Sequence, residues 1–100
     1  MTLLSLIKVS AQVDYSFTTS GEYFSKAYEY LEVKDYLNAF KFFDRIDKSD
    51  TLYELAQFNK LIAQYTSKFY KESLKTAEKL ISSESGYSPE AYFYMIKSQI

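Results

Sequence analysis

Three carboxylates that lie close together in the sequence are of the type that acid–base chemistry requires. Glu29, Glu32 and Asp35 follow one another at three-residue spacing, which on a helix places neighbouring carboxylates on adjacent turns. Catalysis by a carboxylate pair requires surroundings that drive the two pKa values apart. No feature of the sequence around them indicates a buried pocket, so we favour a cluster that faces solvent.

A row of lysines is the second candidate. Lys68, Lys71, Lys75 and Lys79 follow at three- and four-residue spacing, and such a row on one helix face could bind phosphate groups. Two glutamates are interleaved with the lysines, and the formal net charge of the chain is −1. We therefore favour a solvated helix face over a phosphate-binding stripe.

The composition excludes several classes of site. The chain has no cysteine and no histidine, so disulfides, thiol nucleophiles, Cys/His zinc sites and histidine bases are excluded. It also has no glycine-rich phosphate loop and no ligand set with metal spacing. Its 12 basic and 13 acidic residues indicate no attraction to nucleic acid. We expect no catalytic residue, no cofactor, no metal and no enzyme activity.

Among its 100 residues, 47% are hydrophobic, with 11 Tyr and 8 Phe but only two Gly and one Pro. This composition supplies a core but lacks the turn residues of a β architecture, so an all-α domain is expected. No apolar run reaches the roughly 20 residues that span a bilayer.

The start of the chain, residues 1–18, differs from the rest. Its short apolar run ends in Val9-Ser10-Ala11, as a secretory signal does before cleavage, but Lys8 interrupts it and no basic residue precedes it. Residues 1–18 are either a signal-peptide remnant or an unstructured lead-in. The first alternative predicts an exported or periplasmic protein and the second a cytoplasmic one. We expect the chain to be a fragment of a longer protein.

Five helices are expected from apolar positions at helical spacing and from start signals. The starts are at Thr19-x-x-Glu22, Asp35, Thr51-x-x-Glu54, Phe69 and Ser88-Pro89-Glu90. The two Thr-x-x-Glu patterns are predicted capping boxes. Gly86 precedes the last start and is expected to adopt the left-handed conformation that ends a helix.

A spaced pattern recurs along these helices. Tyr23-x-x-Lys26-Ala27-x-x-Tyr30 recurs as Phe58-x-x-Leu61-Ile62-x-x-Tyr65, at an offset of 35, and Tyr92-x-x-Met95-Ile96 begins it again. In the second helices, Lys34 recurs as Lys68 and Ala39 as Ser73, both at an offset of 34. The first helices of the pairs therefore predict an offset of 35, which is one residue longer than the offset of 34 in the second helices.

This pattern resembles the tetratricopeptide repeat (TPR), a helix-turn-helix unit of about 34 residues. The resemblance implies a right-handed superhelix of antiparallel helix pairs over residues 19–100, with about two and a half repeats at approximately 20–50, 51–86 and 88–100. Lys26 stands where the family has Leu, and Ala27 replaces its usual Gly. An ordinary four- or five-helix bundle is the alternative.

The resemblance also implies a site. Proteins of this family hold an extended or helical peptide on the concave face formed by the first helices of each pair. The corresponding aromatic and apolar groove would contain Phe24, Tyr28, Leu31, Leu55, Phe58, Asn59, Ile62, Tyr92 and Ile96. The alternative for each residue is a place in the core.

Two functions follow as hypotheses. In the first, the chain is a protein–protein interaction scaffold that binds a peptide or a partner domain in this groove. In the second, it is a structural spacer or oligomerisation module that precedes the functional domain of a larger exported or sensor protein. The five consecutive large apolar residues from Tyr92 to Ile96 predict an exposed last helix through which the chain could self-associate.

Overall fold

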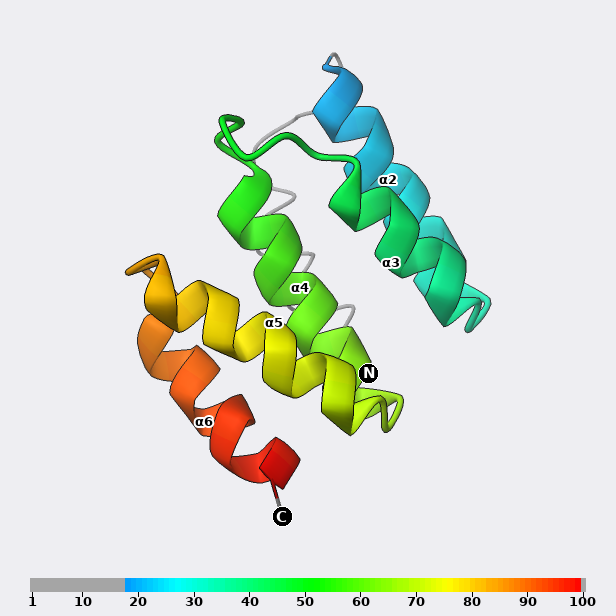
Figure 1. Ribbon diagram of the computed structural model, residues 1–100. Coiled ribbons are helices and arrows are strands. Elements are labelled where there is room, and N and C mark those ends of the chain that lie inside the picture. The colour runs from blue at the N-terminus through cyan, green and yellow to red at the C-terminus, as the bar shows by residue number, and fades with distance from the viewer. Residues whose placement is uncertain (1–17, 100) are drawn as a thin grey trace.

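The computed structural model describes residues 18–99 and shows five α-helices joined by short connections (Figure 1). They are α2 (Thr19–Glu32), α3 (Tyr36–Asp44), α4 (Tyr53–Thr66), α5 (Tyr70–Ser82) and α6 (Ser88–Gln99). No strand occurs in this part of the chain, which confirms the predicted all-α class. The signal remnant or lead-in predicted for residues 1–18 lies, except for Thr18, outside the described residues.

The helices pack in chain order. α2 lies against α3, α4 against α5, and α5 against α6, while α4 also contacts α3 and α6 (Figure 1). α4 contributes to both apolar clusters of the core. Its Ala56 and Ala63 join the cluster formed with α2 and α3, and its Phe58, Leu61 and Ile62 join the cluster formed with α5 and α6. α4 is therefore the element that unites the fold.

The first two helix pairs are equivalent at a single offset of 34. α2 and α4 have the same length and begin at Thr19 and Tyr53; α3 and α5 begin at Tyr36 and Tyr70. Matching core positions are buried in both pairs: Phe24 and Phe58, Ala27 and Leu61, Ala39 and Ser73, Phe43 and Ala77, Ile46 and Leu80. The offset of 35 predicted for the first helices is therefore wrong, since their bounds and core follow 34.

The helix ends explain why lysine recurs at this offset. Lys34 and Lys68 have positive φ angles, 62° and 71°. Each directly follows the C-cap of its helix and begins the same turn. The Lys34 amide donates to the Leu31 carbonyl and the Asp35 amide to the Tyr30 carbonyl, at 3.0 and 2.8 Å, and Lys68 and Phe69 form the equivalent pair. This is the Schellman arrangement, which satisfies the last carbonyls of a helix.

The third such turn corrects a prediction. Glu84 ends α5 with φ of 55°, and its amide donates to the Ile81 carbonyl at 3.1 Å. Gly86 does not have a positive φ, so the predicted left-handed glycine is wrong. The glycine lies two residues beyond the turn that ends the helix.

The helix starts also differ from the predicted capping boxes. Thr18, not Thr19, is the N-cap of α2, and its hydroxyl accepts from the Gly21 amide at 2.8 Å. α4 begins after Leu52 without a side-chain cap. Glu54 instead accepts from the Ser85 hydroxyl at 2.7 Å, which ties the start of α4 to the connection between α5 and α6.

We expect Lys68→Gly to stabilise the protein. A left-handed residue with a Cβ costs about 1–2 kcal/mol, and the greater freedom of glycine in the unfolded chain offsets only part of this gain. The free energy of unfolding, measured by urea denaturation, should rise by about 1 kcal/mol. Lys75→Gly, in the exposed interior of α5, is the matched control and should lower it by about as much. A loss of stability in both variants would contradict the assignment of Lys68 to the left-handed conformation.

Candidate functional site

The structure divides the nine residues of the predicted groove into two groups. Five of them are at most 9% exposed and belong to the core or to the buried side of α4: Phe24, Leu31, Phe58, Asn59 and Ile62. A partner could reach these side chains only by displacing their neighbours. Their burial favours the alternative that they are core residues, and the groove as predicted is not a continuous surface.

The other four are accessible to different degrees. Tyr28 and Leu55 are partly buried against the first core cluster. Tyr92 and Ile96 are 49% and 55% exposed and lie one turn apart on α6. The structure thus leaves α6 as the place where predicted site residues are open to a partner.

One further residue completes this surface. Phe93 is 55% exposed and lies beside Tyr92 and Ile96 on the helix, with the Lys97 ammonium 5.7 Å from the centre of its ring. We call Tyr92, Phe93 and Ile96 the α6 outer face. Phe93 belongs to the run of five large apolar residues that predicted an exposed last helix. The predicted concave groove contained Tyr92 and Ile96 but not Phe93.

The opposite side of α6 attaches the helix to the rest of the protein. Ala91 is fully buried in the second core cluster, against which Tyr94 and Met95 also pack. The Tyr94 ring contacts Phe58 and Tyr65 of α4, with ring centres 6.5 and 5.4 Å apart. Burial raises the pKa of Tyr94, and the Tyr65 phenol raises it further. α6 is therefore held by its inner side while its outer face stays open.

The carboxylates of the candidate acid–base cluster lie at or near the surface. Glu29 is exposed and pairs with Lys26 at 3.7 Å, while the Asp35 carboxylate accepts from the Asn38 amide at 2.8 Å. Across residues 18–99 no group of three or more acidic residues could hold a metal ion. Lys71, Lys75 and Lys79 are exposed on α5, and Lys68 is exposed in the turn before it, as expected for solvated lysines.

No helix among the described residues combines the length and the apolar character needed to cross a membrane. Comparisons with protein-family models, with curated proteins and with solved structures found no significant match. The repeated helix pair and the α6 outer face are the features of the chain that bear on its function.

We expect truncation of Phe58 and of Tyr92 to have different effects on stability. Phe58 is 8% exposed and stacks on Tyr87 with ring centres 4.6 Å apart, so Phe58→Ala should lower the free energy of unfolding by about 3–5 kcal/mol. Tyr92→Ala, on the α6 outer face, should change it by about 0.5 kcal/mol. Urea denaturation followed by circular dichroism measures both. A small change in the free energy of unfolding for Phe58→Ala would indicate that Phe58 belongs to the candidate binding surface and not to the core.

Tyr94 should make stability decrease at alkaline pH. Because its pKa is raised in the folded state, its phenol ionises more readily in the unfolded chain, whose tyrosines titrate near pH 10. The contribution is complete below that pH and is lost as the pH rises through the folded pKa. Denaturation midpoints measured from neutral to alkaline pH should fall less steeply in Tyr94→Phe. An unchanged slope would contradict this role.

Proposed function

We propose that this chain is a TPR-like helical-repeat module that binds another protein through the α6 outer face. The resemblance gains support from the equivalence of the first two helix pairs at one offset and from their matching left-handed turns at Lys34 and Lys68. In such an array the pairs stack into a right-handed superhelix, and each helix that begins a pair packs on both the preceding and the following pair.

The exposed apolar face on α6 is the observation that carries the proposal. Tyr92, Phe93 and Ile96 are each about half exposed and form one side of a helix whose other side is in the core. Exposed aromatic side chains are effective anchors because they bury a large area with few rotatable bonds. A contiguous apolar surface of this kind typically marks an interaction site.

A comparison of α6 with α4 indicates what should cover this face. The two helices begin at Ser88 and Tyr53. Counted from these starts, Ala91 is equivalent to Ala56, and Phe93 is equivalent to Phe58. Both alanines pack toward the preceding helices. Phe58, by contrast, packs in the cluster that includes Ala77 and Leu80 of α5.

The equivalent of Ile96 is Leu61, which lies in that same cluster. At the positions of Phe93 and Ile96, the corresponding side of α4 is therefore covered by the helices that follow it, α5 and α6. The position of Tyr92 corresponds to Gln57. We propose that the partner presents an amphipathic helix, which covers the α6 outer face as α5 covers α4.

A second function uses the same surface. If the occupant is a helix of a second copy of this chain, the module is an oligomerisation or spacer element, in line with the second hypothesis from the sequence. The open face is the observation that favours it. The two functions differ in whether the isolated protein associates with itself.

A peptide with the sequence of residues 69–84 tests the proposed function, because in the intact chain α5 packs on the equivalent side of α4. In a titration followed by NMR, we expect saturable shifts of the Tyr92, Phe93 and Ile96 amides. The double variant Tyr92→Ser/Ile96→Ser should weaken binding by about tenfold, a change of about 1.4 kcal/mol.

The matched control is Val33→Ser/Leu37→Ser, which removes two other exposed apolar side chains, 73% and 63% exposed. It should leave peptide binding unchanged. Equal weakening by both double variants, or shifts confined to other helices, would contradict the proposal. Association that rises with protein concentration in sedimentation, and that Tyr92→Ser/Ile96→Ser abolishes, would assign the face to a second copy instead.

A further inference from the structure

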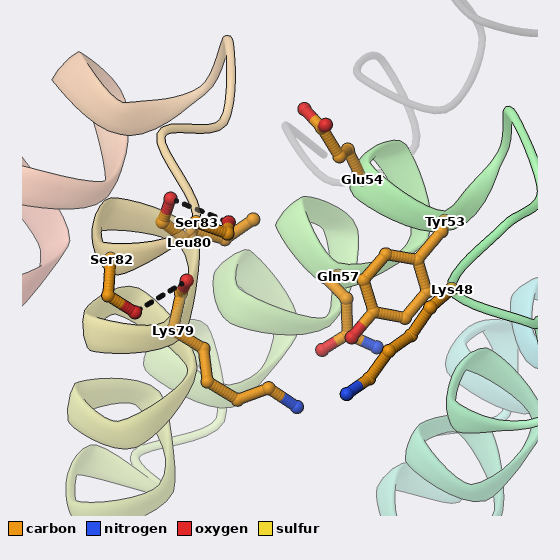
Figure 2. Close-up of a pocket in the computed structure, with 8 residues that line it drawn as sticks. All are labelled: Lys48, Tyr53, Glu54, Gln57, Lys79, Leu80, Ser82 and Ser83. Atoms are coloured by element: carbon orange, nitrogen blue, oxygen red, sulfur yellow. Dashed lines mark hydrogen bonds between the residues drawn. The ribbon is translucent and has the colours of Figure 1, made fainter.

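A pocket of about 350 Å³ lies away from the α6 outer face, where the connection between α3 and α4 approaches α5 (Figure 2). Its lining includes Lys48 from that connection, Tyr53 and Gln57 from the first half of α4, and Lys79 and Leu80 from α5. Three separate elements thus place polar side chains around one hollow.

Two of these side chains carry positive charge. In Figure 2 the ammonium groups of Lys48 and Lys79 point toward one another across the pocket. Among residues 18–99 the ion pairs are Lys26 with Glu29 and Lys60 with Asp44, so neither pocket lysine has a carboxylate partner there. Two ammonium groups in this arrangement repel each other, and an anion between them removes the repulsion.

The acidic residue of the lining does not neutralise the lysines. Glu54 accepts hydrogen bonds from the Ser85 hydroxyl at 2.7 Å and from the Gly86 amide at 3.3 Å. Figure 2 shows its side chain directed away from Lys48 and Lys79. Among the charged residues that line this pocket, the two lysines are therefore the ones without a carboxylate partner.

Gln57 supplies a second, independent indication of a ligand. Its side chain is 3% exposed, and its amide nitrogen donates to an Asp44 carboxylate oxygen at 3.1 Å. The Lys60 ammonium donates to the same oxygen at 2.7 Å. The amide oxygen of Gln57 is buried and has no partner. If the Gln57 amide were reversed, its oxygen would face the Asp44 carboxylate oxygen, and the two would repel each other. The contact with Asp44 therefore identifies the amide oxygen of Gln57 as the atom without a partner.

The unpaired groups together define a ligand. The lysines, with the Tyr53 hydroxyl beside them, require a negatively charged acceptor, whereas the Gln57 oxygen requires a donor. The dianion of a phosphate monoester offers acceptors alone and leaves Gln57 unsatisfied. An aspartate or glutamate in a peptide offers a carboxylate together with nearby backbone N–H groups, and so satisfies both.

We propose that this pocket binds an acidic segment of a partner protein. One carboxylate lies between Lys48 and Lys79, and a backbone N–H of the same segment donates to the Gln57 amide oxygen. The site is separate from the α6 outer face, so the proposal goes beyond the proposed function and does not depend on it. The occupant is assigned by charge complementarity and by the unpaired oxygen of Gln57.

An NMR titration of the whole chain with the peptide acetyl-Asp-Glu-amide tests the proposal. We expect saturable changes in the side-chain amide signals of Gln57 and in the signals of Lys48 and Lys79, with an affinity that falls as salt is added. The neutral peptide acetyl-Asn-Gln-amide should bind about tenfold more weakly, because it lacks the carboxylates. Methyl phosphate, titrated above its second pKa so that it carries no hydroxyl donor, should leave the Gln57 signals unchanged.

Variants at the exposed lysines distinguish binding in this pocket from a general electrostatic attraction to positive charge on the surface. Lys48→Ala and Lys79→Ala should each weaken binding of the acidic peptide by about fivefold or more, with the helix content unchanged. Lys75→Ala, on the same helix as Lys79 but outside the pocket, should have no effect. The proposal is overturned by equal weakening in Lys75→Ala, by methyl phosphate shifting the Gln57 signals as the peptide does, or by the absence of saturable binding.

Discussion

The burial of α4 on every side is the constraint on which the rest of the structure depends. Each residue from Ala56 to Gln64 is buried, so the helix has no side for polar groups to reach water. Four of these nine residues are nevertheless polar: Gln57, Asn59, Lys60 and Gln64. A buried polar group without a partner costs about 1–3 kcal/mol. The neighbouring helices supply partners for Lys60 and Gln64, whereas the side-chain oxygens of Gln57 and Asn59 have none.

Those partners connect the helices around α4. The Lys60 ammonium pairs with Asp44 at the end of α3, at 2.7 Å, since a buried ammonium is tolerated only when it is paired. On the other side, the Thr76 hydroxyl of α5 donates to the Gln64 side-chain oxygen at 2.7 Å. Such bonds are directional in a way that apolar packing is not. They therefore help to set how α3 and α5 lie along α4.

The elements and their recurrence could be predicted from the sequence because they depend on local spacing. Aromatic and small residues at helical intervals predicted five helices, and the recurrence of Lys34 at Lys68 gave the offset that the helix bounds follow. The helix ends could be predicted less well. Lysine and glutamate rarely adopt the left-handed conformation, so their residue type does not indicate the turns in which they adopt it here. Glycine adopts it often, and for this reason the prediction was made for the nearby Gly86.

The candidate site could be predicted only in part, because burial in a helical array is decided by distant residues. Phe58 on α4 and Tyr92 on α6 are both large apolar residues, yet one is 8% exposed and the other 49%. The Phe58 ring is covered by Tyr87 and Tyr94, which follow α5 in the chain, whereas no described helix follows α6. The role of Gln57 was equally hidden, since it depends on Asp44, 13 residues earlier in the chain.

The same comparison shows which kind of contact the proposed binding would share with folding. In a repeat array, each helix that begins a pair has a side that receives the next helix, and this side is apolar wherever it lies in the sequence. On α4 it is filled from within the chain, by Ala77 and Leu80 of α5. On α6 the equivalent side remains half exposed. A partner helix that packs there would make the contact that α5 makes on α4, so the proposed recognition needs no structural device beyond those that already hold the fold together.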